Sequence, residues 1–355
     1  MVGSKGKGTA CAAASWHLAT NHGAKVVSIT SPHYRDVRER IRVDGRPVSP
    51  ETLDSLAAKL AVALATSPRA SPSGVLSVNA RFVAAGLLHA QSIGADVIVL
   101  EAGMGGWSDT ISECPISGLV ITRILEEHLG VLGSTLNEIA RDKLFVSCLP
   151  SVGFTVSLPQ QPELDGLLAS APWIDVLDRP LAMGIPSRDP FRIPNTWLGL
   201  EAADRLVGGQ GVAEAHCRTA LRQVRLEGRG ERFERDGVSF EVHACATPSG
   251  VGALLERHTP DLVLCCVPDQ KDVGGVARVL DGLDVLWCHS RSLVFTFDAS
   301  EAAHDAQSAI HRALASGAQE VLVTGVVGFA GEVTEIFAEG EATQWWITEP
   351  ESLAG

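Results

Sequence analysis

A glycine-rich stretch near the start of the chain carries residue types that bind phosphate. It reads Gly3-Ser4-Lys5-Gly6-Lys7-Gly8-Thr9, and the apolar run over 10–18 predicts that a helix follows it. Glycines let the backbone fold around a phosphate with its N–H groups pointing inward, and a helix N-terminus adds partial positive charge. Lys7 would then reach the terminal phosphates and the Thr9 hydroxyl would hold Mg²⁺. We therefore predict a nucleotide phosphate site here, with a flexible glycine-rich start as the alternative.

Four other polar residues lie at or after the ends of predicted strands, where open α/β sheets bind ligands. Ser31 follows a strand over 25–30, Glu101 ends an apolar strand over 95–100, His128 follows a strand over 118–122, and Lys143 lies on the next helix. Oxygen and imidazole ligands facing a triphosphate would bind Mg²⁺ or Mn²⁺. Each residue also has a structural interpretation, as a turn residue, a cap or a solvated lysine. A purely structural role is hardest to assign to Glu101, because a buried carboxylate needs a cation or hydrogen-bond donors.

The elements that must position these residues alternate between strands and helices, which predicts an α/β fold with a doubly wound, mostly parallel sheet. The apolar run over 95–100 predicts a central strand covered on both faces. Only two residues precede the phosphate loop, although a buried strand normally does. We therefore expect this first strand to be truncated, and we favour a late start of the numbered chain as the cause.

A charged stretch over 225–230 is typical of a linker, and the alternation of strands and helices begins again after it. We expect residues 1–222 to form the nucleotide-binding domain and residues 223–355 a smaller α/β domain. Within the second domain the pattern predicts strands over 238–242, 262–267, 293–297 and 320–323.

Composition narrows the class of protein. The formal net charge is −13, which argues against a nucleic-acid-binding surface but leaves room for an anionic substrate at a local basic cluster. No apolar run is long enough to span a membrane. The eight cysteines are scattered without a Cys-x-x-Cys motif, which predicts free thiols and a cytoplasmic protein instead of a cysteine zinc site or a disulfide framework.

The order of these motifs resembles the folylpolyglutamate synthase and dihydrofolate synthase branch of the Mur ligase superfamily. The likeness runs through most of the first 145 residues. Besides the phosphate loop, the similar segments are Thr30-Ser31-Pro32-His33, Glu39 to Gly45, Val99 to Gly106 with Asp109, Glu127-His128 with Leu132 to Leu136, and Ile139-Ala140-Arg141-Asp142-Lys143.

The resemblance implies a role for each matched residue. Residues 3–9 would hold the phosphates of ATP. Two Mg²⁺ sites are implied, one on Thr9 and Glu101 with help from Ser31, and one on Glu101 and His128. Lys143 occupies the place of a lysine that supports the second metal and is carbamylated in many members. Asn195 would lie near the adenine, and Arg229, which follows Gly228 in the linker, would approach the nucleotide.

The implied activity is an ATP-dependent carboxylate–amine ligase that forms an amide through an acyl phosphate. The second domain would be a Rossmann-like ligase domain, and the partners would be a small carboxylic acid and an amine such as glutamate. The family's Asp-Gly-Ala-His-Asn-Pro motif is replaced here by His243-Ala244-Cys245-Ala246-Thr247-Pro248. The loss of this motif favours a divergent member of the family that acts on an acid other than a folate. The alternatives are a catalytically impaired nucleotide-binding partner subunit, a plain ATPase, or a true folate polyglutamylating enzyme.

Overall fold

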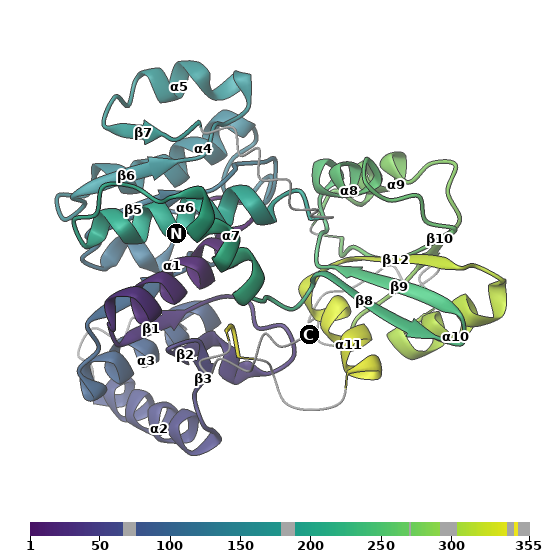
Figure 1. Cartoon of the computed structure of the whole chain (residues 1–355), viewed down its shortest axis with the longest axis horizontal. Coiled ribbons are helices and arrows are strands. Elements are labelled where there is room, and N and C mark those ends of the chain that lie inside the picture. The colour runs from purple at the N-terminus through teal and green to yellow at the C-terminus, as the bar shows by residue number, and fades with distance from the viewer. Residues whose placement is uncertain (67–75, 179–188, 270, 292–303, 339–343, 347–355) are drawn as a thin grey trace.

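Two groups of strands and helices lie side by side, one from each half of the chain (Figure 1). The structure is a computed structural model that describes residues 1–66, 76–178, 189–269, 271–291, 304–338 and 344–346. The helices are α1 (Lys7–His22), α2 (Pro50–Thr66), α3 (Val78–Ile93), α4 (Leu136–Phe145), α5 (Asp165–Ala169), α6 (Arg192–Leu206), α7 (Glu214–Gln223), α8 (Pro248–Leu255), α9 (Val273–Val279), α10 (Ala306–Ser316) and α11 (Val327–Phe337). The strands are β1 (Val26–Ile29), β2 (Ile41–Val43), β3 (Arg46–Pro47), β4 (Val97–Leu100), β5 (Gly118–Ile121), β6 (Phe154–Ser157), β7 (Ile174–Val176), β8 (Arg229–Arg235), β9 (Val238–His243), β10 (Leu262–Cys266), β11 (Val285–Trp287) and β12 (Glu320–Gly325).

The first two residues join the two sheets of the N-terminal part, whose strand orders are β3-β2-β1-β4 and β5-β6-β7. The Met1 amino group donates to Leu100 O at 2.7 Å, and Ala102 N donates to Met1 O at 3.0 Å. On the other side Val2 N donates to Val120 O at 2.8 Å. Residues 1–2 therefore lie in the strand position between β4 and β5, the place of the strand that we expected to be truncated.

Helix α1 packs closely against α6 because its contact face is made of small residues. Ala10, Ala12 and Ala13 are fully buried, and a Cβ at Gly199 of α6 would clash with the carbonyl oxygen of Ala10. The helix extends beyond the predicted 10–18 at both ends, since it starts at Lys7 within the glycine loop. This extension places the N-terminal N–H groups of the helix directly at the loop.

One predicted feature of this part differs in the structure. Strand β4 is not covered on both faces, since Ile98 keeps 38% of its surface exposed. One reason is that α3 packs mainly over β1, where a Cβ at Gly86 would meet the side chain of Ile29. The arginine-rich segment over 34–42, which follows β1, contains a 3₁₀ turn, Val37–Arg40, and the start of β2, which pairs antiparallel with β1.

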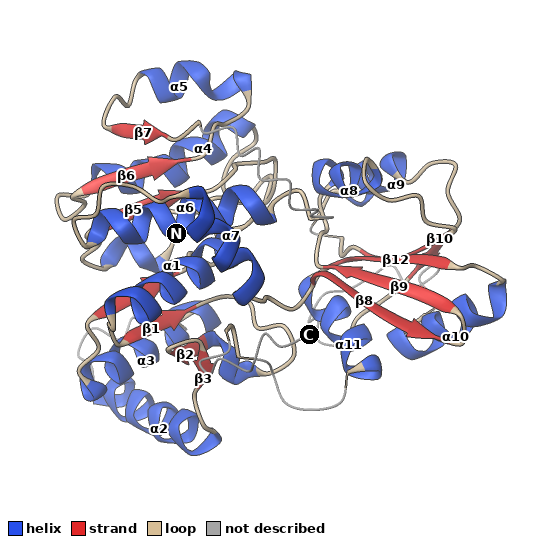
Figure 2. Ribbon diagram, viewed as in Figure 1, coloured by secondary structure: helices blue, strands red, loops and turns tan. Residues whose placement is uncertain are grey.

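The C-terminal part is a five-stranded sheet in the order β11-β10-β12-β9-β8. Helices α8 and α9 cover one face, and α10 and α11 cover the other (Figure 2). Strands β9, β12, β10 and β11 run parallel, and β8 is antiparallel to β9. This agrees with the predicted α/β pattern, although β8, β11 and α11 were missed, and the strand predicted over 293–297 lies outside the described residues.

The chain passes between the two parts over residues 224–228, from α7 to β8. The predicted linker overlaps the start of β8, because alternating charged residues at 229–235 form an edge strand. A boundary near 222 and 223 stays our proposal. Among the described residues, no helix is long and apolar enough to cross a membrane.

Candidate active site

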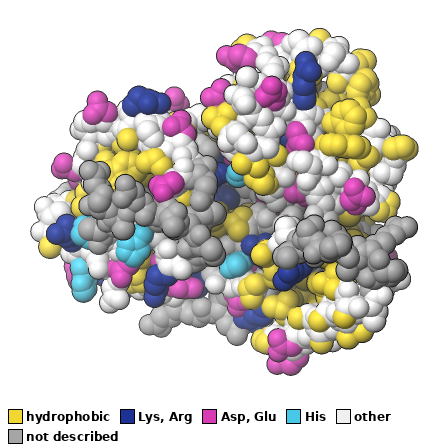
Figure 3. Space-filling view, turned by 180° about the vertical axis from the view of Figure 1, so that it is seen from behind, with side chains coloured by type: hydrophobic (Ala, Val, Ile, Leu, Met, Phe, Trp, Pro, Cys, Tyr) yellow, Lys and Arg dark blue, Asp and Glu magenta, His cyan; other side chains and the backbone are white. Residues whose placement is uncertain are grey.

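A cleft of about 970 Å³ lies between the two parts of the chain. Its N-terminal wall is formed by the glycine loop together with Ser31, Glu101, Glu127 and His128. Its C-terminal wall is formed by residues 243–247 with Lys271 and Arg291, and Arg229 of the linker lies between the walls. Basic and histidine side chains are visible in the recess between the two lobes (Figure 3). This distribution of charge suits an anionic ligand, although the chain as a whole is acidic.

The glycine loop leaves the N-terminus of α1 open toward the cleft. Gly6 caps the helix with φ +89°, and no side chain caps the first turn. Gly3 has φ +126°, and a Cβ there would collide with Thr122. Lys7 Nζ donates to Gly3 O at 2.9 Å, so the lysine lies back along the loop. Uncapped N–H groups at a helix N-terminus beside a lysine form an anion site, which fits a phosphate.

Glu101 lies beside the first turn of α1. A Cβ on Gly8 would be 3.8 Å from Glu101 Oε2, and Ser31 N donates to the same oxygen at 3.2 Å. The side chains of Thr9 and Glu101 are both buried. Burial raises the pKa of Glu101, although the charge of Lys7 acts in the opposite direction. A cation bound between Thr9, Ser31 and Glu101 would keep this carboxylate ionised.

Glu127, His128 and Lys143 form a second charged group next to the loop. Lys143 is 1% exposed, and its Nζ lies 3.6 Å from Glu127 Oε1 and donates to Gly3 O at 3.1 Å. Burial, followed by the charge of Lys7, lowers the pKa of Lys143 to about 8. Burial alone would raise the pKa of Glu127, but the surrounding lysines, led by Lys7 and Lys143, outweigh it and lower that pKa to about 2. Glu127 is therefore ionised at neutral pH.

His128 contacts the opposite wall of the cleft. Its Nε2 lies 3.5 Å from Lys271 Nζ. Burial, followed by the charge of Lys271, lowers the pKa of His128 to about 4. The imidazole is therefore neutral at pH 7 and has a lone pair to offer a metal ion. The residue adopts φ +56°, a strained conformation for a side chain other than glycine.

Asn195 lies behind the glycine loop, and Arg229 lies at the end of the linker, between the two walls of the cleft. Asn195 is 1% exposed on α6, and a Cβ at Gly6 would collide with its amide. Asn195 Nδ2 donates to Phe191 O at 2.7 Å, whereas its buried Oδ1 has no hydrogen-bond partner among the described residues. Arg229 Nη1 donates to Gly228 O at 2.9 Å, and its charge opposes the raised pKa of Glu101.

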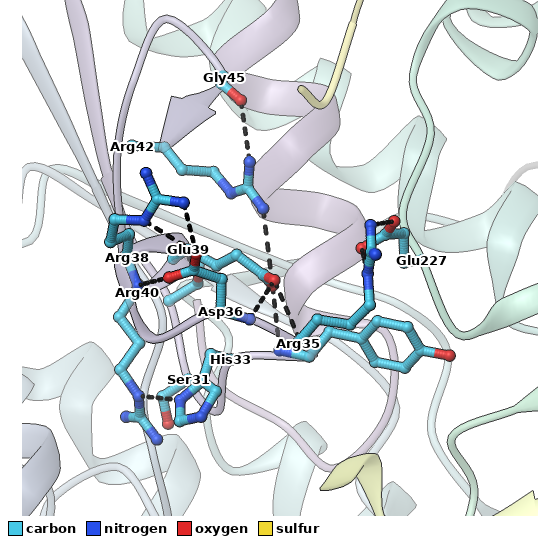
Figure 4. Close-up of polar contacts among 12 residues, drawn as sticks. Ser31, His33, Arg35, Asp36, Arg38, Glu39, Arg40, Arg42, Gly45 and Glu227 are labelled. Atoms are coloured by element: carbon cyan, nitrogen blue, oxygen red, sulfur yellow. Dashed lines mark hydrogen bonds and ion pairs between the residues drawn. The ribbon is translucent and has the colours of Figure 1, made fainter. Parts of the chain in front are cut away.

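The arginine-rich loop after β1 is held by a network of hydrogen bonds (Figure 4). The Glu39 carboxylate accepts from the backbone N–H groups of Tyr34, Arg35 and Asp36 at 2.8–3.0 Å. Arg35 forms two hydrogen bonds to Glu227, at 2.6 and 3.2 Å, which fasten the loop to the linker. The loop therefore couples the N-terminal wall to the segment that leads into the second sheet.

The structure brings most of the predicted residues together. Lys7, Thr9, Ser31, Glu101 and His128 line one cleft, and so do the remaining loop residues other than Gly3. Three of the predicted residues are held at least partly within the protein. Lys143 lies beneath the surface against Glu127, Asn195 lies behind the loop, and the Ser4 hydroxyl accepts from Leu125 N at 3.0 Å within the protein.

Sequence reasoning missed Glu127 and Lys271 as members of the site. Glu127 directly precedes His128 after a predicted strand, so its position was a usable signal. Lys271 also follows a predicted strand, the one over 262–267, but it contacts His128 across 143 positions of the chain, and no local pattern places these two side chains together. Only the packing of the two parts against each other reveals that contact.

Comparison with curated proteins finds relatives in several kingdoms, while no protein-family model matches the chain. A probable bifunctional folylpolyglutamate synthase/dihydropteroate synthase of Haloferax volcanii is 37% identical over 147 residues, 41% of this chain and 17% of that protein. The mitochondrial folylpolyglutamate synthase of Bos taurus is 33% identical over 320 residues, 79% of this chain and 53% of that protein. The chain thus spans about half of the bovine relative and less than a fifth of the archaeal one.

Solved structures show the same fold. Folylpolyglutamate synthase of Mycobacterium tuberculosis, complexed with ADP and AMPPCP, superposes with a TM-score of 0.79 at 22% identity, covering 96% of this chain and 90% of that one. A bifunctional folylpolyglutamate synthase/dihydrofolate synthase with Mn, AMPPNP and L-glutamate bound gives a TM-score of 0.74 at 19% identity, with coverages of 94% and 88%. The predicted two-domain α/β architecture is confirmed.

Proposed function

The chain is a divergent member of the folylpolyglutamate synthase family of the Mur ligase superfamily, and from this we propose that it is an ATP-dependent ligase joining a carboxylic acid to an amino acid. One observation carries the proposal. The open N-terminus of α1 lies beside a buried carboxylate, Glu101, and a buried ion pair, Glu127–Lys143. Such a site would bind a nucleoside triphosphate and stabilise the charge of phosphoryl transfer.

The loop residues would bind and orient the phosphates. N–H groups from Gly6 to Thr9 face the cleft at the start of α1, and Lys7 would shift from Gly3 O to a terminal phosphate. Asn195 Oδ1, buried without a partner among the described residues, would accept a hydrogen bond from the adenine amino group. Arg229 would approach the phosphates from the linker.

The donor set of the cleft fits magnesium. Thr9, Ser31 and Glu101 supply hard oxygen ligands, and the neutral imidazole of His128 with Glu101 would hold a second ion. When bound, Mg²⁺ supplies charge stabilisation at the transferred phosphoryl group. Lys143 would hold Glu127 ionised beside the loop, and its lowered pKa leaves a fraction of the amine neutral at pH 7, as carbamylation requires.

The acid and the amine would meet between the two walls. An acid on the N-terminal wall would be phosphorylated on its carboxylate, and the incoming amine would attack the acyl phosphate from the side of residues 243–247, releasing phosphate and forming the amide. Ala244, Cys245 and Ala246 are small and uncharged there. We propose an acid other than the folate of the bovine and mycobacterial enzymes, with an amino acid such as glutamate as the amine. We propose that the reaction takes place in the cytoplasm, and the free cysteines among the described residues support this proposal.

The test is acid-dependent release of ADP from purified protein with Mg²⁺-ATP, using a panel of acids paired with glutamate and other amines. Lys7→Ala and Glu101→Gln should abolish the stimulated rate, whereas Glu126→Gln, an exposed neighbour of Glu127, should leave it intact. Rapid turnover of dihydropteroate or tetrahydrofolate would show a folate enzyme instead. Nucleotide binding without turnover of any pair would favour a partner subunit, and ADP release without an added acid would indicate an ATPase.

A further inference from the structure

Three side chains on the α8 face of the C-terminal sheet have the chemistry and spacing of a transition-metal site. They are Glu241 and His243 on β9 and His258 just after α8. One ligand atom from each can be chosen so that all three lie within 4.8 Å of one another. We propose that Glu241, His243 and His258 bind one divalent ion of the zinc class. This proposal does not depend on the proposed ligase activity.

The two distances from Glu241 are close to those around a tetrahedral ion. Glu241 Oε1 lies 3.1 Å from His243 Nε2, and Glu241 Oε2 lies 3.6 Å from His258 Nδ1. Two ligand atoms bound about 2.05 Å from a tetrahedral centre are about 3.4 Å apart, a value between these two distances. Two imidazoles and one carboxylate are a common donor set for Zn²⁺ with one further position open. An ion would also draw together the two imidazole nitrogens, which lie within the 4.8 Å spread of the cluster.

Burial makes a cation favourable at this point. The side chains of Glu241, His243 and His258 are 4%, 3% and 6% exposed. The opposite face of β9 follows the usual rule and buries Val238, Phe240 and Val242 in an apolar core. A carboxylate and an imidazole are unusual side chains for a strand covered on both faces. A bound divalent ion would interact favourably with all three groups.

Glycine backbone approaches the cluster on one side, and a pocket opens beside it. Gly230 lies at a register shift where β8 pairs with β9, and its φ is +89°. A Cβ at Gly230 would stand 3.3 Å from His243 Cε1 and 3.7 Å from Glu241 Oε1. A separate pocket of about 220 Å³, lined by Glu241 and His258 together with Arg257 and Glu320, offers space for a water as the fourth ligand.

A metal ion bound at this cluster would stabilise the C-terminal wall of the large cleft. His243 also lines the large cleft, and residues 244–247 connect β9 to α8 along its C-terminal wall. An ion bound to His243 and His258 would tie the start of this segment to the residues that follow α8. Its removal should therefore lower the stability of the C-terminal sheet and loosen that wall.

The test is metal binding by the whole chain after treatment with a chelator. Co²⁺ is titrated in the presence of excess Mg²⁺, which occupies the oxygen-rich sites of the cleft, and the visible bands of four-coordinate Co²⁺ are followed. We expect one equivalent to bind and to be displaced by Zn²⁺. His258→Asn should weaken binding on the order of 100-fold or more. Zn²⁺ should raise the melting temperature of the wild type and not that of the variant.

Two further variants distinguish an ion bound at this cluster from an ion bound elsewhere on the chain. His258→Cys replaces one zinc ligand by another, so it should retain Co²⁺ and add a sulfur-to-cobalt charge-transfer band. His216→Asn removes a histidine from another, partly buried group, where His216 Nε2 lies 2.8 Å from His17 Nδ1, and it should bind Co²⁺ like the wild type. The proposal is overturned if the wild type binds no Zn²⁺ or Co²⁺. It is also overturned if His258→Asn leaves binding unchanged while Glu101→Gln removes it, because the ion would then lie in the cleft.

Discussion

The two walls of the cleft differ in how they use charge. The N-terminal wall buries Glu101, Glu127 and Lys143 close to an open helix N-terminus. The facing segment over 243–247 carries small, uncharged side chains after His243, and Lys271 and Arg291 contribute its positive charge. A buried charge is retained only where something stabilises it, which is why we propose a polyanion and metal ions as the ligands of the N-terminal wall. The C-terminal wall is where this chain departs most from the family's motif.

The largest expected effect falls on the N-terminal wall. Glu101→Gln removes the buried carboxylate beside Gly8 and Ser31 while preserving its shape. We expect acid-dependent ADP release to fall on the order of 10³-fold, because charge at the transferred phosphoryl group loses its metal-binding partner. Steady-state release of ADP measures it, and Glu126→Gln is the matched control. Equal rates in the two variants would contradict the assignment of this wall to phosphoryl transfer.

A second substitution tests the ion pair beneath the loop. Lys143→Met keeps much of the side-chain volume but leaves Glu127 without its partner at 3.6 Å. We expect kcat to fall about 10²-fold and the free energy of unfolding to fall by about 3 kcal/mol, since a buried charge is left uncompensated. Turnover and urea unfolding measure the two quantities. Arg141→Gln, at an exposed position of the same helix, should change neither, and a similar loss there would refute a specific role for Lys143.

A third substitution sharpens the comparison from the other side of the cleft. Lys271→Ala removes the cation that lies 3.5 Å from His128 Nε2. We expect kcat to fall about tenfold, equivalent to about 1.4 kcal/mol, with little change in the affinity for ATP, because the lysine acts when the walls meet. Turnover and calorimetric titration with nucleotide separate the two. Arg278→Ala, exposed on α9, serves as the control. A large loss of ATP affinity would show that Lys271 belongs to the nucleotide site itself.

The N-terminal wall could be predicted from the sequence because its signals are local. The glycine loop, Ser31, Glu101 and His128 each follow a recognisable strand or open a helix, and such positions meet at one edge of an α/β sheet. The contact between Glu127 and Lys143 was not predicted, although both residues belong to segments that the sequence singled out. Their pairing depends on how α4 packs beneath the loop.

The contacts that join distant segments could not be read from the sequence. Trp346 is 1% exposed in the core of the N-terminal part, against Gly45, and Arg225 N donates to Trp345 O at 2.8 Å. No local pattern predicts that residues near the end of the chain pack beside α1. The cluster of Glu241 with His258 is another case, since its members lie on a strand and after a helix and meet only through packing.

The last expected effect is on stability and not on turnover, and it concerns Glu231, at the start of the strand that follows the linker. Burial is the main cause that raises its pKa to about 7, while the N–H of Gly228 at 2.6 Å opposes the shift. The folded chain therefore holds this proton between pH 4.5 and 7, whereas the unfolded chain releases it. Because the folded state binds more protons in that window, the contribution of Glu231 to stability is present below pH 4.5 and lost as the pH rises through 7.

Glu231→Gln should remove this dependence. Relative to the wild type, we expect the variant to gain roughly 1–3 kcal/mol of unfolding free energy between pH 5 and pH 8, measured by urea unfolding across that range. Glu234→Gln, at an exposed position of the same strand, should run parallel to the wild type. If Glu231→Gln instead runs parallel to the wild type, Glu231 does not hold a proton in the folded chain between pH 5 and pH 7. The start of β8 would then have the pH dependence of an exposed segment, and unusual protonation would be confined to the residues of the cleft walls.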